Sequence, residues 1–235
     1  MSNPYFRFKK FTVWHDRCAM PVGTDGVLLG AWAELGRAMR ILDVGTGSGL
    51  IALMAAQRNE SAAIVGIDVD DASISQAVEN VSSSPFSGRI EILHEDVRSF
   101  RPSELFDAII CNPPFYTEAI LPPDEGRCVA RNTASLGFGE LVESASVLLA
   151  DQGFFNVIIP TQAESSFISL CLMSRLYVHR RCYVKTTVRK DAKRVMITFS
   201  KSVCTNPSSD VLVLSDKDSR RTREYADLTR EFYLW

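Results

Sequence analysis

Ile41-Leu42-Asp43-Val44-Gly45-Thr46-Gly47-Ser48-Gly49-Leu50 is the stretch that decides the fold of this chain. It begins as a short apolar run, passes through a glycine-rich turn and continues into a helix-forming segment, Ile51 to Ala55. Glycines let the backbone adopt positive φ and approach a ligand closely, and the helix that follows presents unpaired N–H groups. A strand, a glycine loop and a helix in this order predict a site for a nucleotide cofactor.

The spacing of the glycines favours one class of cofactor over another. A dinucleotide fingerprint, G-x-G-x-x-G, needs glycine at position 50, where this chain has Leu50. The glycines instead run G-x-G-x-G from Gly45 to Gly49. Hydride transfer is therefore the weaker interpretation.

Strand-like and helix-like segments alternate around this loop. Strands are expected near 40–44, 64–68, 90–94 and 107–111, and helices near 48–58 and 71–82. This alternation predicts an α/β fold with a doubly wound, Rossmann-like, mostly parallel sheet. Further along we expect a helix over 138–149, a strand over 154–159 entered through a turn at Gly153, a helix over 163–174, a terminal antiparallel hairpin from 177–185 and 194–199, and a loop over 206–209.

Carboxylates follow two further strands. Asp68 ends the second strand, at about the distance from the glycine loop expected for a residue that binds a ribose diol. The third strand leads to Asp96 and Val97, which would meet the amino group and the face of an adenine. Taken alone, each acid is more typical of a helix cap or a solvated loop. Ligands of such sheets bind at the carboxyl ends of the strands, so these residues are expected to share one site.

Asn112-Pro113-Pro114-Phe115 follows the apolar run 106–111. The Asn112 side-chain oxygen and the Pro113 carbonyl can each accept a hydrogen bond from an NH2 group, while Phe115 offers a face for stacking. Two such acceptors would free the lone pair of a purine amine, so positioning would carry most of the rate without a strong base. This pattern favours methyl transfer to nitrogen. The alternative is that the prolines only end a buried strand.

Together, these features resemble the class I S-adenosylmethionine-dependent methyltransferases that modify amino groups through an N-P-P-[FY] motif. The segments His15 to Met20 and Gly23 to Trp32, and the ending Glu224 to Leu234, are similar to the bacterial valine tRNA adenine-N6 methyltransferases. The resemblance spans almost the whole chain. It implies S-adenosylmethionine as cofactor and methylation of adenine-37, just 3′ of the anticodon of a valine tRNA.

The resemblance also implies roles for individual residues. The catalytic residues would be Asn112, Pro113, Pro114 and Phe115. The cofactor would be bound by Thr24, Asp25, Asp43, Gly45, Gly47, Gly49, Asp68, Asp96, Val97 and Asn112. A helix N-cap would explain Asp25 equally well. His15 is more typical of a surface histidine than of a proton-transfer group, because no base is needed.

Charge is unevenly distributed along a chain whose formal net charge is −2. Basic residues cluster between positions 175 and 194 and alternate with aromatic ones near the N-terminus. The residues expected to contact RNA phosphates are Lys9, Lys10, Arg17, Arg189, Lys190, Lys193 and Arg194. Phe6, Phe8 and Phe11 are more typical of an edge strand with one buried face than of base stacking.

Composition predicts one domain, residues 1–235, with a basic and aromatic N-terminal segment over 1–35. Six cysteines without a C-x-x-C pair and three scattered histidines favour neither a metal site nor a disulfide framework. No leader peptide and no membrane-spanning stretch is evident, so a cytoplasmic enzyme is expected. No obligate protein partner is evident. Two other functions remain open: a methyltransferase acting on a protein glutamine amide, and a non-catalytic subunit that binds the cofactor or RNA.

Overall fold

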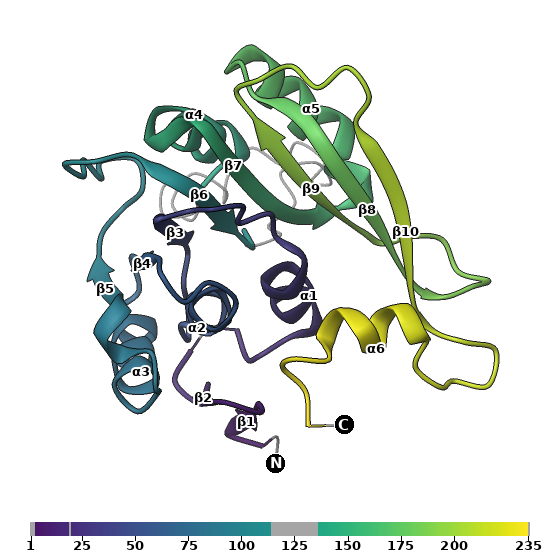
Figure 1. The fold of residues 1–235 in the computed structure, drawn as a ribbon, viewed down its shortest axis with the longest axis horizontal. Helices are drawn as coiled ribbons and strands as arrows, with labels where there is room; N and C mark the ends of the chain where they lie inside the picture. The colour runs from purple at the N-terminus through teal and green to yellow at the C-terminus, as the bar shows by residue number, and fades with distance from the viewer. Residues whose placement is uncertain (1–2, 19, 114–135, 235) are drawn as a thin grey trace, which may run out of the picture.

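The computed structural model describes residues 3–18, 20–113 and 136–234 (Figure 1). The described α-helices are α1 (Thr24–Trp32), α2 (Leu50–Arg58), α3 (Asp71–Ser82), α4 (Phe138–Leu148), α5 (Glu164–Met173) and α6 (Arg223–Thr229). The described strands are β1 (Tyr5–Arg7), β2 (Thr12–Trp14), β3 (Arg40–Val44), β4 (Ala63–Asp68), β5 (Ile90–His94), β6 (Phe106–Cys111), β7 (Leu149–Pro160), β8 (Tyr177–Thr187), β9 (Arg194–Ser200) and β10 (Ser208–Ser215).

Eight of these strands form one sheet in the order β10-β8-β9-β7-β6-β3-β4-β5. The strands from β3 to β7 are parallel to their neighbours within that group, whereas β9 runs antiparallel to β7 and to β8. The α/β fold with a mostly parallel sheet and an antiparallel hairpin is therefore confirmed. Val44 lies opposite both Ile67 and Cys111, so the residues that follow β3, β4 and β6 emerge at the same edge.

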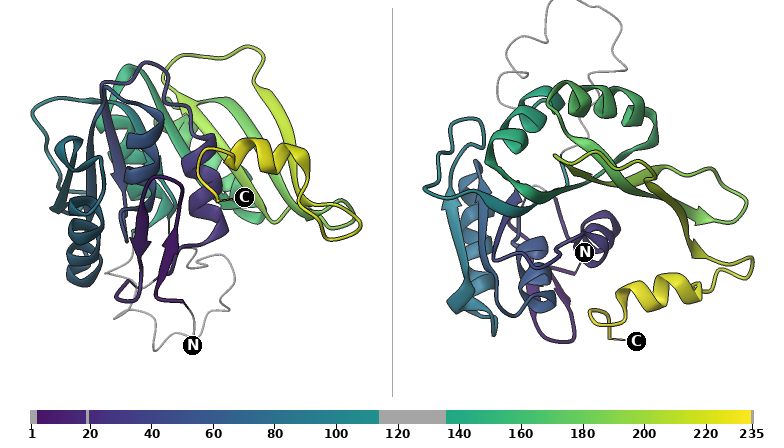
Figure 2. Two further views of the ribbon diagram at one scale, coloured as in Figure 1. Left: turned by 60° about the horizontal axis from the view of Figure 1, so that its bottom comes forward. Right: turned by 45° about the horizontal axis from the view of Figure 1, so that its top comes forward.

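Helices cover both faces of the sheet (Figure 2). One face carries α1, α2 and α3, and the other carries α4 and α5. Neighbouring residues of β3 show the division, because Ile41 belongs to the buried apolar cluster under α1 and α2, while Leu42 belongs to the cluster under α4 and α5. Side chains alternate between the two faces of a strand, so a strand buried on both faces reads as a continuous apolar run.

The N-terminal strands β1 and β2 pair with each other and pack beside the C-terminal end of the chain (Figure 1). Phe8 and Phe11, in the turn between them, are buried, and the Phe8 ring stacks on Tyr233 with centroids 6.0 Å apart. The backbone N–H of Lys9 donates to the carbonyl of Phe232 over 2.8 Å. Burial rather than base stacking is thus the role of the Phe8 and Phe11 rings.

Two details of the second half differ from the sequence-based expectations. Gly153 lies inside β7 and does not form a turn; a Cβ there would lie 2.9 Å from the carbonyl oxygen of Asp107, so glycine is what allows β6 and β7 to approach. Ser208 and Ser209, expected in a loop, begin β10, which pairs with β8 in parallel. β10 is an edge strand in which only Leu212 is buried, so its apolar signal is weak.

None of the helices in the described parts of the chain has the length and apolar character that crossing a bilayer requires.

Candidate functional site

The glycine loop between β3 and α2 is held against the end of β4. The backbone N–H groups of Gly45 and Thr46 both donate to the carbonyl oxygen of Ile67 over 2.9 Å. Gly45, Gly47 and Gly49 have φ values of 68°, 53° and 78°. Side chains are strained in this left-handed region, which explains the three glycines. A Cβ at Gly45 would meet nothing within 4 Å, so the space beside the loop is open.

Asp43 lies beneath this loop and is almost completely buried. Its Oδ2 accepts hydrogen bonds from Thr46 Oγ1 over 2.7 Å and from the backbone N–H of Ala52 over 3.1 Å. Its Oδ1 is buried and has no hydrogen-bond partner among the described residues. Burial raises the pKa of this carboxyl from 3.8 to about 7, against the effect of the two hydrogen bonds, with a smaller contribution from Asp68.

Asp68 ends β4 and faces the glycine loop. Its Oδ2 accepts a hydrogen bond from the Gly47 N–H over 2.8 Å, while its Oδ1 accepts from the N–H groups of Val69 and Asp70. The residue after β5 also contacts Asp68, because the Glu95 N–H donates to the Asp68 carbonyl over 3.0 Å. The carboxylate expected to bind a ribose therefore lies directly beside the glycine loop.

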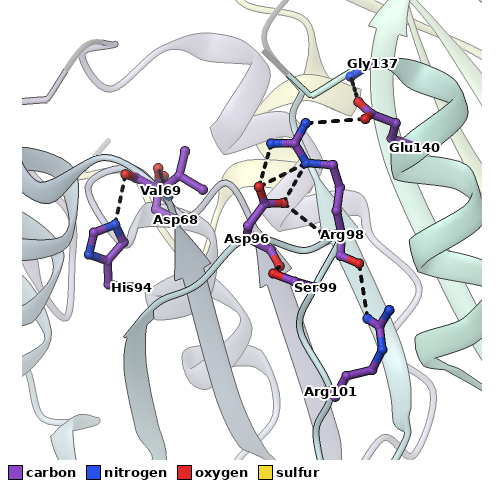
Figure 3. Close-up of polar contacts among 9 residues, drawn as sticks. All are labelled: Asp68, Val69, His94, Asp96, Arg98, Ser99, Arg101, Gly137 and Glu140. Carbon is purple, nitrogen blue, oxygen red and sulfur yellow. Dashed lines mark hydrogen bonds and ion pairs between the residues drawn. The ribbon is translucent and has the colours of Figure 1, made fainter. Parts of the chain in front are cut away.

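Asp96, after β5, is engaged by an arginine two residues further along (Figure 3). Arg98 donates from Nε to both carboxylate oxygens over 2.9 Å and from Nη2 to Oδ2 over 2.5 Å. The hydrogen bonds from Arg98 lower the pKa of Asp96. Arg98 Nη1 also donates to Glu140 over 3.3 Å, which links this loop to the start of α4. Val97 between them is buried in the core under α4 and α5.

Asn112 follows β6 and lies beside Gly26 of α1. A Cβ at Gly26 of α1 would lie 4.0 Å from Asn112 Nδ2 and 3.1 Å from a methyl carbon of Leu50. Glycine at this position therefore lets α1 approach Leu50 and Asn112 closely. The Asn112 Oδ1 atom is buried and has no hydrogen-bond partner among the described residues. Pro113 is buried next to it. The predicted catalytic residues Pro114 and Phe115 lie outside the described residues.

Thr24 and Asp25 form the start of α1 at the same edge of the sheet. The N-cap of α1 is Gly23, so the interpretation of Asp25 as a helix cap is wrong. The Asp25 carboxylate instead pairs with Arg194, whose Nε lies 2.9 Å from Oδ2. Arg194 begins β9 opposite Pro160, the last residue of β7, which places the ion pair at the carboxyl edge of the parallel strands.

The other residues expected to contact RNA differ in their surroundings. Arg189, Lys190 and Lys193 are exposed between β8 and β9, at the same edge as Arg194. Lys9 donates from Nζ to the Arg230 carbonyl over 2.5 Å, near the end of α6. The Arg17 side chain pairs with Glu79 of α3, and Lys10 is exposed.

Asn80 is a buried residue that joins the N-terminal segment to the glycine loop, and it is not among the residues predicted from the sequence. Its Nδ2 donates to the carbonyls of Trp14 and Ser48, and its Oδ1 accepts from the Trp14 N–H. A signal for it exists, because Ser73, Gln76 and Asn80 recur at helical spacing on the buried face of α3. Arg98 was missed too, and its basic side chain two residues after Asp96 is the only signal in the sequence.

Cysteines and metal-ligating groups offer no second site in the part of the chain that the structure describes. The five described cysteines are free thiols, and Cys128 lies outside the described residues. No group of three or more His, Cys, Asp or Glu side chains that could hold a metal ion occurs among the described residues. His15, also described, donates from Nε2 to the Asn3 carbonyl over 2.9 Å, and its Nδ1 accepts from the Val22 N–H over 3.3 Å.

Comparisons with known proteins all indicate a methyltransferase family. The model of the methyltransferase small domain family matches residues 23–174. A tRNA1(Val) (adenine(37)-N6)-methyltransferase of Phocaeicola vulgatus is 44% identical over 239 residues, covering 100% of this chain and 99% of that protein. A protein of the same name from Actinobacillus succinogenes is 42% identical and covers 97% of each chain.

Solved structures resemble the fold. A crystal structure described as a predicted O-methyltransferase from Agrobacterium tumefaciens has a TM-score of 0.69 and 22% identity, covering 88% of this chain and 96% of that one. A putative RNA methyltransferase from Pyrococcus horikoshii has a TM-score of 0.54 and 18% identity, covering 77% and 82%. At these identities the likeness concerns the fold alone.

Proposed function

The chain belongs to the family of tRNA1(Val) (adenine(37)-N6)-methyltransferases, and from this premise we propose that it methylates N6 of adenine 37 in tRNA1(Val). It is an S-adenosylmethionine-dependent methyltransferase. The choice of target atom rests on Asn112, at the end of β6, whose buried side-chain oxygen has no hydrogen-bond partner among the described residues. A buried acceptor without a partner costs free energy, so such an atom points to a donor supplied by a ligand.

The residues around the glycine loop fit S-adenosylmethionine. The second oxygen of Asp43 is buried without a described partner, and the space beside Gly45 is open. Asp43 and the loop glycines would hold the methionine part, and Asp68 would accept hydrogen bonds from the ribose hydroxyls. Asp96 would meet the adenine amino group with an oxygen that Arg98 also engages. When bound, the cofactor supplies a methyl group on a positively charged sulfur.

Asn112 would position the target nitrogen. Its Oδ1 would accept one hydrogen of the adenine N6 amine and the Pro113 carbonyl would accept the other. Both bonds draw the nitrogen out of the plane of the ring, so its lone pair becomes available. The methylated nitrogen is acidic enough to release its proton to water, and no residue is assigned as a base. Pro114 and Phe115 belong to the proposed catalytic group, in which the Phe115 ring would stack on the adenine.

The surroundings suit an RNA substrate. The exposed basic residues Arg189, Lys190 and Lys193 lie along the edge that carries Asn112, where they would contact phosphates. We further propose that residues 1–235 act as one catalytic unit, that the segment 1–35 contributes to RNA binding, that no protein partner is required, and that the enzyme works in the cytoplasm.

One assay tests this function against its rivals. The purified chain is incubated with labelled S-adenosylmethionine and, separately, with unmodified tRNA1(Val), the same tRNA carrying guanine at position 37, and ribosomal protein. We expect labelled N6-methyladenosine from the first tRNA alone. Label in glutamine would indicate a protein methyltransferase instead, and binding of cofactor without labelled product would indicate a non-catalytic subunit.

A further inference from the structure

The hairpin of β1 and β2 has one buried face and one exposed face. Phe6 lies opposite Val13, and both pack toward the core, whereas Tyr5 lies opposite Trp14 on the other face. Tyr5 is 38% exposed and Trp14 is 45% exposed. Their ring centroids are 5.0 Å apart with the planes tilted by 50°. Two large aromatic rings therefore stand together in solvent at one end of the hairpin.

Trp14 is fixed relative to the glycine loop through a single buried side chain. The Asn80 amide accepts from the Trp14 N–H over 2.9 Å and donates to the carbonyls of Trp14 and Ser48 over 2.8 and 2.9 Å. All the hydrogen-bonding groups of this amide are thus used, and Asn80 is 1% exposed. The aromatic pair consequently has a set position beside the cofactor loop.

The chain that follows Trp14 runs along α3 toward Asp68. The Arg17 N–H donates to Gln76 over 3.1 Å, one helical turn before Asn80. Burial raises the pKa of the Cys18 thiol to about 11; a hydrogen bond with Ser73 opposes this rise, and the charges of Asp68 and Asp70 add to it. An open depression of about 540 Å³ lies between Trp14, Arg17 and α3. The exposed rings and this depression form one surface, because Trp14 belongs to both.

The chemistry of this surface suits an unpaired nucleotide. Single-stranded RNA is recognised largely by stacking its bases on aromatic side chains, with cationic groups nearby for the phosphates. Arg7 lies two residues from Tyr5 on the same exposed face, about 7 Å along the strand. Arg7 and Lys10 are exposed and form no ion pair within the described residues. Of the two acids that line the depression, Asp16 and Glu79, Glu79 is paired with Arg17.

We propose that Tyr5 and Trp14 form a stacking platform for an unpaired base of the RNA substrate, outside the pocket that holds the methylated adenine. This inference rests on the proposed function, because it names how that substrate is held. The platform adds binding free energy at a distance from the reacting atoms. It should therefore act on RNA affinity and not on the chemical step.

Paired substitutions separate the role of the rings from that of apolar bulk. Trp14→Leu and Tyr5→Leu remove a ring, whereas Trp14→Phe and Tyr5→Phe retain one. We expect each Leu variant to raise the Kd and KM for tRNA1(Val) about tenfold, the effect of losing one stacked base. The kcat at saturating tRNA and the Kd for S-adenosylmethionine should stay within about twofold of the native values. The Phe variants should bind tRNA within about threefold of the native chain.

Controls distinguish failure of this inference from failure of the proposed function. Met173→Ala, which removes an 83% exposed apolar side chain from α5, should leave tRNA binding unchanged. A native chain that methylates tRNA while both Leu variants bind it normally would overturn the platform alone. Lack of methylation by the native chain would overturn the function as well. If the Leu variants instead abolish self-association in sedimentation without altering the Kd for tRNA, the rings contact a second copy and the inference is wrong.

Discussion

The backbone N–H of Gly47 donates a hydrogen bond to Oδ2 of Asp68 over 2.8 Å, which joins the glycine loop to the end of β4. The other oxygen of Asp68 already accepts from two N–H groups of the following turn. Asp68 therefore shapes the loop as well as offering lone pairs to a ribose. Removing its carboxylate should affect cofactor binding through both routes.

Asp68→Ala is predicted to raise the Kd for S-adenosylmethionine between roughly tenfold and a hundredfold, the range for a lost hydrogen bond to a charged group. Asp68→Asn should lie between this variant and the native chain, because its amide oxygen can still accept from Gly47. Titration calorimetry measures both values. Asp71→Ala, which removes an exposed carboxylate three residues away, is the control and should bind normally. An unchanged Kd in Asp68→Ala would remove the ribose assignment.

Asn112→Ala is predicted to lower kcat by roughly a hundredfold or more while the Kd for S-adenosylmethionine stays nearly constant. The reason is that Asn112 would contact the reacting amine, and losing one preorganised polar contact in an active site typically costs this much. Asn112→Asp is the matched variant, since it keeps the shape but changes the charge and removes the amide donor. Single-turnover rates with bound tRNA report the chemical step. Native-like turnover in Asn112→Ala would contradict the proposed role.

The glycine loop and the strands of the site were predictable from sequence because each depends on a short stretch of residues. Gly45, Gly47 and Gly49 occupy positive-φ positions that other residues rarely adopt, and apolar runs buried on both faces mark β3 and β6. The shared edge of the parallel strands then brings Asp43, Asp68 and Asn112 together. The fold class and these strand-end residues follow from the order of elements alone.

Pairings between distant parts of the chain were not predictable in this way. Asp25 and Arg194 are 169 positions apart, and only the three-dimensional packing of α1 beside β9 brings them into contact. The same holds for Trp14 and Asn80, which are 66 positions apart. Tyr5 and Trp14 show the limit for side chains, since the sequence does not reveal that these two rings lie in contact on the exposed face of the hairpin.

The basic turn between β8 and β9 should govern the salt dependence of RNA binding. Replacing Arg189, Lys190 and Lys193 with Gln is predicted to weaken tRNA binding and to reduce the slope of log K against log salt by about 2 to 3. Each neutralised phosphate contributes roughly 0.7 to 0.9 to that slope. Binding measured between low and moderate salt gives both quantities.

Two controls belong with this measurement. Arg37→Gln with Arg175→Gln removes exposed charges near the opposite edge of the sheet and should leave the slope unchanged. The effect of Arg194→Gln on tRNA binding should differ from that of the triple variant, because Arg194 also pairs with Asp25 at the start of α1. A slope that stays at its native value in the triple variant would mean that the turn is only a solvated surface.

Asp43 should make both stability and cofactor binding depend on pH. Its pKa is raised by burial from 3.8 to about 7 in the folded chain. Between these values the folded state holds a proton that the unfolded state has released. The contribution of Asp43 to stability is therefore fully present below about pH 4 and is lost as the pH rises through about 7.

Cofactor binding should change in the opposite direction over the upper part of this range. Ionised Asp43 would attract the ammonium group of the methionine moiety, so the affinity for S-adenosylmethionine is predicted to rise between about pH 6 and pH 8, as the carboxyl loses its proton near pH 7. Asp43→Asn carries no charge at any pH, and should flatten this rise. Because the ammonium group of the cofactor titrates identically with both proteins, the difference between their calorimetric profiles isolates Asp43. Parallel profiles would mean that the buried Oδ1 of Asp43 does not face the ammonium group.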